Sequence, residues 1–484
     1  MNTSRTTIQR DRAAGALVGL ASGDAVGAGY EFDPPMAAGH PVAMIGGGPA
    51  PFQPGEWTDG TSMAIAIAEI AATGADLRHE DSLDYIAERW HWWSRTAKGI
   101  DTQTATVLSM AGSQGISAQM CRRAAQDLHE RIGRSGGDRS LMRTAPVALS
   151  YLDDEDALVV AARLISELTH FHPEAGDACV LWCLAIRHAV LTGDLEVRIG
   201  LPHIPSGRRD TWAARVAEAE QAGAYHFALG NERAASALQA AWAAVVHTPT
   251  PTDDPVCRVF RADHLRLAIE TAARARGHTN TVAAIAGGLV GAAYGASAVP
   301  WHWRLTLKGW PGLNTRGLVK LANLTVEGGD ARTFAVGYRA CRNVPRPVRH
   351  PDDDALWLGA APSLHSLPAG IDAVVSLCPV EDGHIPAGVV HLHADIGCSN
   401  RELALLDSAR AVEALRAQGR TVFAHGATAT NRAPAVAVLY AARCRGRSID
   451  AALDGVRAVM SDVDMEPALR RALHVLHPAG GGGR

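Results

Sequence analysis

The sequence lacks an excess of charge and any paired cysteine motif. It has 46 Lys and Arg against 50 Asp and Glu, a formal net charge of -4, without the basic surplus of nucleic-acid-binding domains. Its eight cysteines include no C-x-x-C pair, so neither a disulfide framework nor a zinc site is favoured. We therefore expect an ordinary globular protein with no nucleic-acid partner.

Segments typical of membrane proteins and secreted proteins are also lacking. Residues 1–12 are polar and charged, without the apolar core of a signal peptide. No later stretch is apolar without interruption over the length that crosses a bilayer. These absences predict a cytoplasmic protein without membrane contact.

The length of the chain and the pattern of its apolar residues predict a multidomain fold. A chain of 484 residues is longer than one hydrophobic core usually supports. Residues 12–312 are rich in Ala and Leu at helical spacing, which predicts an all-α bundle. Within them, residues 13–29 and 282–295 are so rich in small and apolar residues that they predict two central, closely packed helices.

The pattern of apolar residues changes after a polar stretch that contains several prolines. Short apolar runs at 373–377, 389–392 and 421–424 alternate with helical patterns such as 401–417, which indicates an α/β sheet domain. The predicted boundaries are a helical domain at 1–341, an exposed linker at 342–353, an α/β domain at 354–476 and a disordered tail at 477–484.

Several polar motifs lie in the helical part, in this order: Gly23-Asp24-Ala25-Val26-Gly27 with Glu31, Trp57-Thr58-Asp59-Gly60-Thr61, Gly99-Ile100-Asp101-Thr102, Ser140-Leu141-Met142-Arg143, Thr169-His170, and Gly277-His278-Thr279-Asn280-Thr281. Together they resemble the ADP-ribosylglycohydrolase family over nearly all of residues 12–312. The resemblance implies an all-helical domain that uses two magnesium ions to cleave ADP-ribose from its acceptor.

In that family the metal ligands come from loops that resemble T-D-D and D-x-D-T. The matching ligand positions here are Thr58, Asp59, Asn280 and Thr281, whereas Gly60 and His278 stand where the family has carboxylates. Magnesium favours oxygen ligands anchored by carboxylates, so we expect at most one weakly held ion. Helix N-capping is the alternative role for Thr58, Asp59 and Thr281.

The resemblance also implies roles for other residues. Glu31 and Asp59 match catalytic positions, because a carboxylate beside a glycosidic bond can position water or stabilise positive charge. The implied substrate-binding residues in this domain are Asp24, Asp101, Arg143 and His170. For His170, simple packing is the alternative.

In the α/β domain, a strand-like run leads into a loop from His425 to Arg432. The loop resembles the dual-specificity phosphatase signature, H-C, five residues, then R and Ser or Thr, and the resemblance covers about residues 354–476. Gly426 occupies the nucleophile position and Ala433 the hydroxyl position, so phosphatase chemistry, which needs a thiolate, is expected to be lost.

Phosphate binding could outlast that chemistry, since a helix start favours anions and an arginine clamps phosphate. The resemblance assigns this role to His425 and Arg432. Asp395 matches the family's general acid, with an exposed loop aspartate as the alternative.

Three readings of the whole chain stay open. The first is a protein that binds ADP-ribose or ADP-ribosylated macromolecules without efficient turnover, because the substitutions fall together at reactive positions. The second is an active magnesium-dependent ADP-ribosyl hydrolase, or one in which Asp59 and Glu31 organise water without the usual metal pair. The third is a scaffold that uses no small-molecule site.

Overall fold

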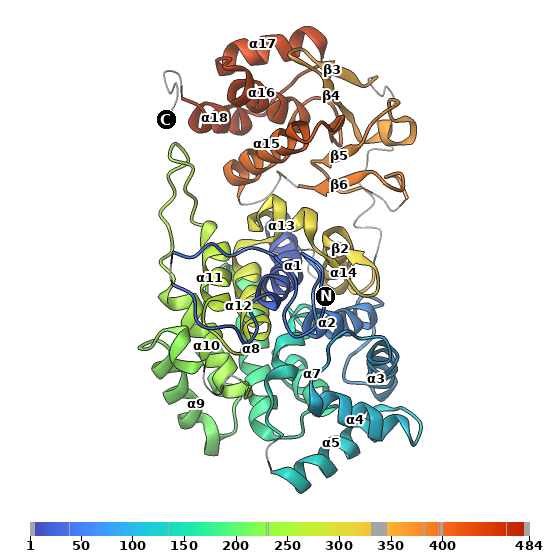
Figure 1. The fold of residues 1–484 in the computed structure, drawn as a ribbon, viewed down its shortest axis with the longest axis vertical. Helices are drawn as coiled ribbons and strands as arrows, with labels where there is room; N and C mark the ends of the chain where they lie inside the picture. The colour runs from blue at the N-terminus through green and yellow to red at the C-terminus, as the bar shows by residue number, and fades with distance from the viewer. Residues whose placement is uncertain are drawn as a thin grey trace. The chain divides into compact units, whose positions relative to one another are not determined.

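The computed structural model describes residues 5–37, 39–133, 135–228, 230, 232–330, 346–380, 383–394, 396, 400–460 and 462–478. The chain divides into two compact units (Figure 1). The helical unit comprises residues 1–249, 264–299 and 306–330, and the α/β unit comprises 250–263, 300–305 and 331–484. Both predicted architectures are therefore present.

The helical unit is built almost entirely from α-helices. Its helices are α1 Thr7–Ala28, α2 Asp59–Ala71, α3 Glu80–Ser94, α4 Thr102–Gly112, α5 Ala118–Ile132, α6 Ala145–Ser150, α7 Glu155–Glu167, α8 Pro173–Thr192, α9 Ser206–Ala219, α10 Ala234–His247, α11 Asp263–Ala273, α12 Thr279–Tyr294 and α14 Thr315–Val326. A 3-10 helix, η1 (Asp138–Arg143), and a short hairpin of β1 (Lys308–Gly309) and β2 (Leu313–Asn314) complete the part used below.

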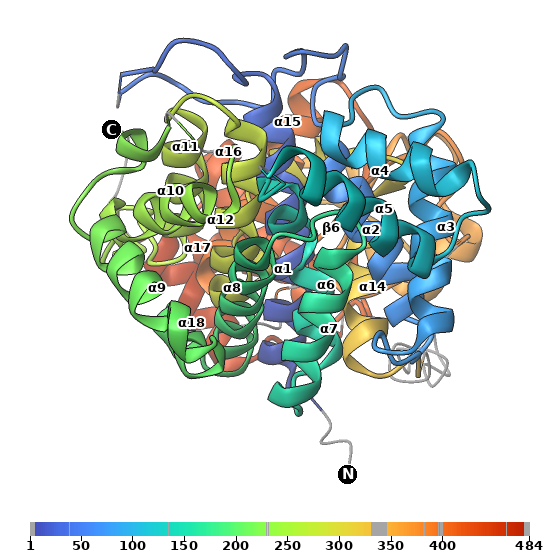
Figure 2. The same cartoon turned by 90° about the horizontal axis from the view of Figure 1, so that it is seen from below.

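Helices α1 and α12 form the centre of this unit, as the small residues of both segments predict. Figure 2 shows α1 among the surrounding helices, and it contacts α2, α6, α8, α12 and α14. The two helices touch through their backbones: a Cβ on Gly23 would lie 1.9 Å from the Ala283 carbonyl oxygen. Only glycine permits this approach, so the contact fixes the ends of α1 and α12 against each other.

Helix α8 corrects the expectation that no segment is long and apolar enough to cross a membrane. By length and composition α8 passes that test, although 78% of the stretch is buried inside the fold. A charged residue within it also has protein partners, since Asp177 accepts hydrogen bonds from Arg163 at 2.6 Å and Arg208 at 2.5 Å. A buried core helix explains the composition.

The α/β unit contains a five-stranded sheet of order β3-β4-β7-β5-β6, in which the β3–β4 pair is antiparallel and the other pairs are parallel. The strands are β3 Val348–His350, β4 Asp353–Ala360, β5 Ala373–Ser376, β6 Val390–His393 and β7 Val422–Gly426. The helices are α13 Trp301–Thr306, α15 Arg401–Ala417, α16 Arg432–Arg445, α17 Ile449–Val459 and α18 Pro467–Leu476. The three predicted strand runs and the predicted helix at 401–417 are confirmed.

The predicted linker at 342–353 is partly wrong, because its described part includes strand β3 and the first residue of β4. His350 is buried there and its Nε2 lies 3.2 Å from the Ala437 carbonyl oxygen, while Arg349 stacks over Trp357. Residues 342–345, and the tail beyond 478, lie outside the described residues.

The α/β unit also includes residues that lie within the range predicted to form the helical domain. Arg304 of α13 donates a hydrogen bond to Asp407 at 2.9 Å, and both side chains are buried. Arg304 also donates to the His393 carbonyl oxygen at 3.0 Å. A single boundary in the sequence therefore does not separate the two units.

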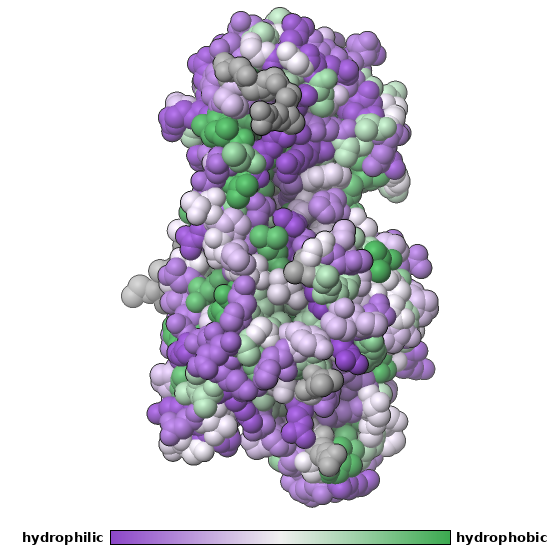
Figure 3. Space-filling model, turned by 60° about the vertical axis from the view of Figure 1, so that its left-hand side comes forward, coloured by the Kyte–Doolittle hydropathy of each residue, from purple (hydrophilic) through white to green (hydrophobic). Residues whose placement is uncertain are grey.

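On the face shown in Figure 3, hydrophobic residues are scattered among hydrophilic ones rather than gathered into one patch. Isolated exposed hydrophobic residues are normal in globular proteins. Among the described residues on this face, no broad apolar patch is seen.

Candidate functional site

A cavity of about 750 Å³ opens in the helical unit, within the roughly 300–1,000 Å³ of small-molecule sites. It lies where the segment after α1 and the N-termini of α2, α4 and α12 meet η1. Lining residues from the sequence motifs are Glu31, Thr58, Asp59, Asp101, His278 and Asn280. The motifs are thus brought together, although they span about 250 residues of sequence.

Asp24 fastens the start of α2 to α1. Its buried carboxylate accepts hydrogen bonds from the backbone N–H and hydroxyl of Thr58, at 3.1 and 2.5 Å, and from those of Thr61, at 3.0 and 2.6 Å. Burial raises the pKa of Asp24 to about 6, against the opposing effect of these hydrogen bonds. The structure gives Asp24 a fastening role, and its expected substrate contact stays a prediction.

The four expected metal-ligand positions lie side by side but bond to one another. Asn280 Nδ2 donates to Thr58 Oγ1 at 3.2 Å, and Thr58 Oγ1 lies 3.1 Å from Asp59 Oδ1. Asn280 Oδ1 accepts from the backbone N–H of Thr281 at 2.8 Å. The N-capping alternative is wrong for Thr58, whose side chain makes no capping bond because its hydroxyl donates to Asp24.

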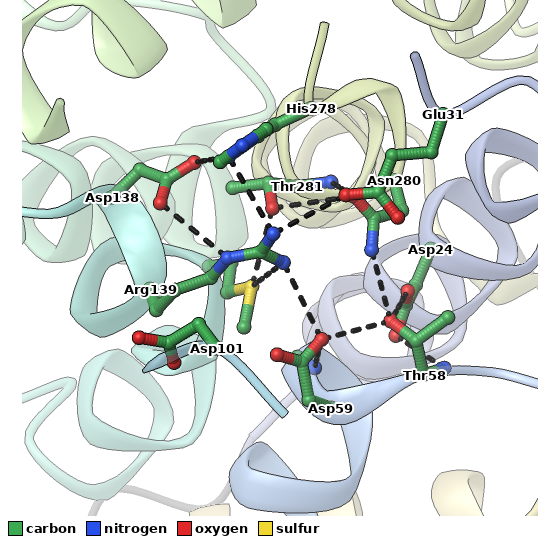
Figure 4. A network of polar contacts seen from close by, with 12 residues as sticks. Asp24, Glu31, Thr58, Asp59, Asp101, Asp138, Arg139, His278, Asn280 and Thr281 are labelled. Carbon is green, nitrogen blue, oxygen red and sulfur yellow. Dashed lines mark hydrogen bonds and ion pairs between the residues drawn. The ribbon is translucent and has the colours of Figure 1, made fainter. Parts of the chain in front are cut away.

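Neither Asp59 nor Thr281 occupies an N-cap position. His278, rather than Thr281, occupies the N-cap position of α12, and its side chain makes no capping bond. Asp59 is the first residue of α2, and its carboxylate accepts from the adjacent Gly60 N–H at 3.1 Å. The polar side chains at these helix starts point instead towards one another (Figure 4).

Arg139, in η1, lies at the centre of this group and is a site residue that the sequence analysis did not predict (Figure 4). Its guanidinium nitrogens lie 3.2 Å from Glu31 Oε1, 3.4 Å from Asp59 Oδ1 and 3.5 Å from Asp138 Oδ1. The residue is 8% exposed. Burial opposes its charge, but the surrounding carboxylates outweigh burial and raise its pKa.

Asp138, also missed, pairs with His278. The imidazole Nδ1 lies 2.8 Å from Asp138 Oδ2. Burial lowers the pKa of His278, but the hydrogen bond to Asp138 and its charge raise it further than burial lowers it. The pKa of Asp138 is lowered: burial opposes this, and the charges of Arg139 and His278 prevail. His278 is thus a group that favours positive charge at this place.

The carboxyls of Glu31 and Asp59 both have raised pKa values. Burial is the main cause for each, with Arg139 opposing it. Carboxyls with raised pKa in a cavity can serve as general acids or bases. The two residues expected to be catalytic therefore remain chemically suited to proton transfer.

Of the other expected substrate-binding residues here, Asp101 lines the cavity. Its Oδ1 caps α4 through the Thr104 N–H at 2.9 Å, while its Oδ2 is buried without a hydrogen bond. Arg143 is fully buried, stacks 4.0 Å over Trp90 and donates to Thr169 Oγ1 at 2.7 Å. Arg143 therefore belongs to the packed interior.

His170 is fully buried and its Nδ1 lies 2.7 Å from Thr169 Oγ1. Because Arg143 donates to that hydroxyl, the hydroxyl proton points to Nδ1, and the neutral imidazole carries its own proton on Nε2. Burial lowers the pKa of His170 to about 4. This arrangement favours the packing alternative for His170.

Two polar residues of the α/β loop, His425 and Arg432, bond to the end of β5 and the residue that follows it. His425 is buried, with Nε2 2.7 Å from Ser376 Oγ, and burial lowers its pKa to about 4. Arg432 donates to the Leu377 carbonyl oxygen at 2.8 Å. Asp395 lies outside the described residues. Phosphate binding by this loop stays a prediction.

The residues at the cavity do not fit a pair of magnesium ions. Among the residues that the structure describes, no three His, Cys, Asp or Glu side chains are grouped so as to hold a metal ion. A magnesium centre needs several carboxylate or carbonyl oxygens facing the ion. Here the oxygens of Glu31, Asp59 and Asp138 face the guanidinium of Arg139.

Comparison with known proteins agrees with the motifs. Residues 5–333 match the ADP-ribosylglycohydrolase family. The ADP-ribosylarginine hydrolase Tri1 of Pseudomonas putida (strain GB-1) is 28% identical over 302 residues, 60% of this chain and 73% of that protein. The ADP-ribosyl-dinitrogen reductase glycohydrolase of Rhodospirillum rubrum is 25% identical over 305 residues, 60% of this chain and 89% of that protein.

Solved structures match the two units separately. An ADP-ribosylglycohydrolase-related protein complex is 25% identical, covers 67% of this chain and 100% of its own, and gives a TM-score of 0.51. Human DUSP28 is 22% identical and covers 28% of this chain and 93% of its own, with a TM-score of 0.25. Because the family match spans residues 5–333, well over half of the sequence, the chain belongs to the ADP-ribosylglycohydrolase family.

Proposed function

We propose that the cavity of the helical unit binds the ADP-ribosyl group of an ADP-ribosylated protein and holds it without efficient cleavage. The observation that carries this proposal is the guanidinium of Arg139 among Glu31, Asp59 and Asp138. The family and the cavity volume support an ADP-ribosyl ligand. The relatives named as ADP-ribosylarginine and ADP-ribosyl-dinitrogen reductase hydrolases support a protein-borne one.

Charge at the cavity is compatible with a pyrophosphate. Lys98 and Arg233 line it together with Arg139. Cationic side chains bind phosphate oxygens through charge-assisted hydrogen bonds. Arg139 offsets one of the three carboxylate charges of the cluster, so we expect the pyrophosphate to bind on the side of Lys98 and Arg233.

Efficient hydrolysis, by contrast, lacks its usual activator. Metal-dependent hydrolases lower the pKa of a bound water and so create a nucleophile near neutral pH. A guanidinium stays protonated and acts as a hydrogen-bond donor, so it can orient an anion but cannot bind and ionise water in that way. We therefore expect binding to persist and turnover to be slow.

A second candidate, metal-free hydrolysis, is favoured by one observation, the raised pKa of both Glu31 and Asp59. A carboxylate with raised pKa is a better general base near neutral pH. In this candidate one carboxylate takes a proton from water as the water attacks the ribose anomeric carbon, and the bond to the acceptor nitrogen breaks. The acceptor leaves with a proton from the second carboxyl.

Calorimetry with ADP-ribose, in magnesium and then in EDTA, tests the binding proposal. We expect the same affinity in both buffers and no release of ADP-ribose from an arginine-ADP-ribosylated protein. Arg233→Ala should weaken binding about tenfold, the loss of one charge-assisted hydrogen bond. Arg123→Ala, an exposed residue of α5, is the matched control and should bind like wild type.

The outcomes separate the candidates. Steady release in EDTA that is lost in Glu31→Gln would favour metal-free hydrolysis. Release that requires magnesium would contradict both candidates and indicate a working metal centre. Absence of binding at millimolar ADP-ribose would contradict both and leave the scaffold reading.

A further inference from the structure

The guanidinium of Arg139 lies where three carboxylates from different elements converge. Glu31 follows α1, Asp59 begins α2 and Asp138 begins η1. All three approach Arg139 within 3.2 to 3.5 Å. Such a cluster needs a cation, because burying several carboxylates without compensation is very unfavourable.

The position of the Arg139 side chain is fixed by its contacts. It belongs to η1, whose six residues are all buried, and its Nη1 also lies 3.9 Å from Met142 Sδ. The side chain is therefore anchored at its base by packing and at its tip by charge. No rearrangement of a loop is needed to bring it to the carboxylates.

Met142 supplies an independent observation at the same place. A Cβ on Gly60 would lie 3.0 Å from Met142 Sδ and 3.2 Å from its Cγ. Met142 Sδ also accepts from Thr281 Oγ1 at 3.5 Å. The space that a carboxylate side chain at position 60 would need is thus filled, and a thioether is a poor ligand for magnesium.

These contacts differ from a metal site that has merely lost ligands. A vacated site would leave carboxylates facing one another, with strong repulsion and an open volume between them. Here the volume is filled by Arg139 and Met142, and the carboxylate oxygens face guanidinium nitrogens. Each of the three carboxylates therefore has a cationic partner in Arg139.

We propose that Arg139 is a built-in cation that takes the place of divalent metal at this centre and makes the centre independent of metal. The proposal concerns the centre itself and holds whichever ligand the cavity binds. Its tests accordingly use metal ions and thermal stability, so failure of ADP-ribose binding and failure of this proposal are distinguishable.

Electron paramagnetic resonance with Mn²⁺, which reports free and bound ion separately, tests the wild-type protein first. We expect no saturable site at micromolar to sub-millimolar Mn²⁺ and no change in melting temperature with Mn²⁺ or EDTA. Stoichiometric Mn²⁺ binding that disappears in Asp59→Asn would overturn the proposal.

Removing the cation gives the converse result. Arg139→Ala should melt well below wild type in EDTA, and Mn²⁺ should raise its melting temperature by about 5 °C or more as the ion binds the exposed carboxylates. The matched control is Arg163→Ala, which removes an arginine from the buried carboxylate of Asp177 in the same unit and should show no Mn²⁺ effect.

Two further variants keep the test decisive. Arg139→Lys retains the charge and should gain no Mn²⁺ site. If Arg139→Ala does not fold, Arg139→Gln, which keeps hydrogen-bonding capacity without charge, replaces it with the same expected rescue. A Mn²⁺ response in the uncharged variant no larger than in Arg163→Ala would overturn the proposal.

Discussion

The centre of the helical unit and the loop at 425–432 of the α/β unit hold their polar side chains in different ways. In the helical unit, Arg139 lies among three carboxylates that line or adjoin the cavity. In the loop, Gly426 has no side chain, and Arg432 donates to the Leu377 carbonyl oxygen.

The difference bears on which groups each place can offer to a ligand. The helical centre keeps ionisable side chains at a polar cavity. In the loop, His425 and Arg432 bond to Ser376 and to the Leu377 carbonyl oxygen at the end of β5. The three predictions that follow probe this contrast, in decreasing order of expected effect.

The largest effect on stability is expected at the backbone contact between α1 and α12. Gly23→Ala places a methyl group 1.9 Å from the Ala283 carbonyl oxygen, so α1 and α12 must separate. We expect a loss of about 3 kcal/mol or more in the free energy of unfolding of the helical unit, measured by urea titration. Gly207→Ala in α9, where a Cβ meets nothing within 4 Å, is the control. Equal stability of both variants would contradict the backbone contact.

The second prediction gives two residues, Asp24 in the helical unit and His425 in the α/β unit, opposite effects on how stability depends on pH. Burial raises the pKa of Asp24 from 3.8 to about 6, so its contribution to stability is full below pH 3.8 and is lost as pH rises through 6. Burial lowers the pKa of His425 from 6.5 to about 4, so its contribution is full above pH 6.5 and is lost as pH falls through 4. Each effect is worth about 3 kcal/mol.

Hydrogen exchange read by mass spectrometry at pH 4 to 6.5, corrected for intrinsic rates, resolves the two units. We expect the difference in α1 protection between wild type and Asp24→Asn to fall as pH increases, because this difference isolates Asp24 from other titrating groups such as His170. The difference in β7 protection between wild type and His425→Gln should rise. The same slope in both differences would refute the comparison.

The smallest effect is expected from restoring a thiol to the loop. In Gly426→Cys the new Cβ would lie 2.9 Å from the Thr428 carbonyl oxygen, so the loop must shift at a cost of about 1 kcal/mol. We expect no hydrolysis of p-nitrophenyl phosphate above that of Ala427→Cys, a thiol on the neighbouring residue. Turnover in Gly426→Cys alone would show that the loop still forms a phosphate cradle.

Much of the fold was predictable because it rests on local pattern. The small-residue segments predict the contact between α1 and α12, and the apolar runs near 373, 390 and 422 predict the parallel strands. Strand β3 was missed because Pro347 and Pro351 flank a run of three residues whose pairing with β4 is tertiary. A polar, proline-bearing run resembles a linker until a partner strand is known.

The centre itself was predictable only in part. Resemblance places Thr58, Asp59 and Asn280 together, but nothing local indicates that Arg139 joins them. Its partners Glu31 and Asp59 lie 108 and 80 residues away in the sequence. The available signal was weak, an Asp138-Arg139 pair directly before a family motif, and an isolated Asp-Arg pair is more often a surface salt bridge.

The backbone contact between α1 and α12 has a consequence for how this protein can change. Because glycine main chain, rather than any reactive side chain, sets the distance between the Asp24 segment and the Asn280 segment, side chains at the centre can be exchanged while the frame stays fixed. A new cation and a new thioether could thus enter without redesign of the surrounding helices. The shape of the cavity therefore depends on the contact between the helices, and not on which side chains line the cavity.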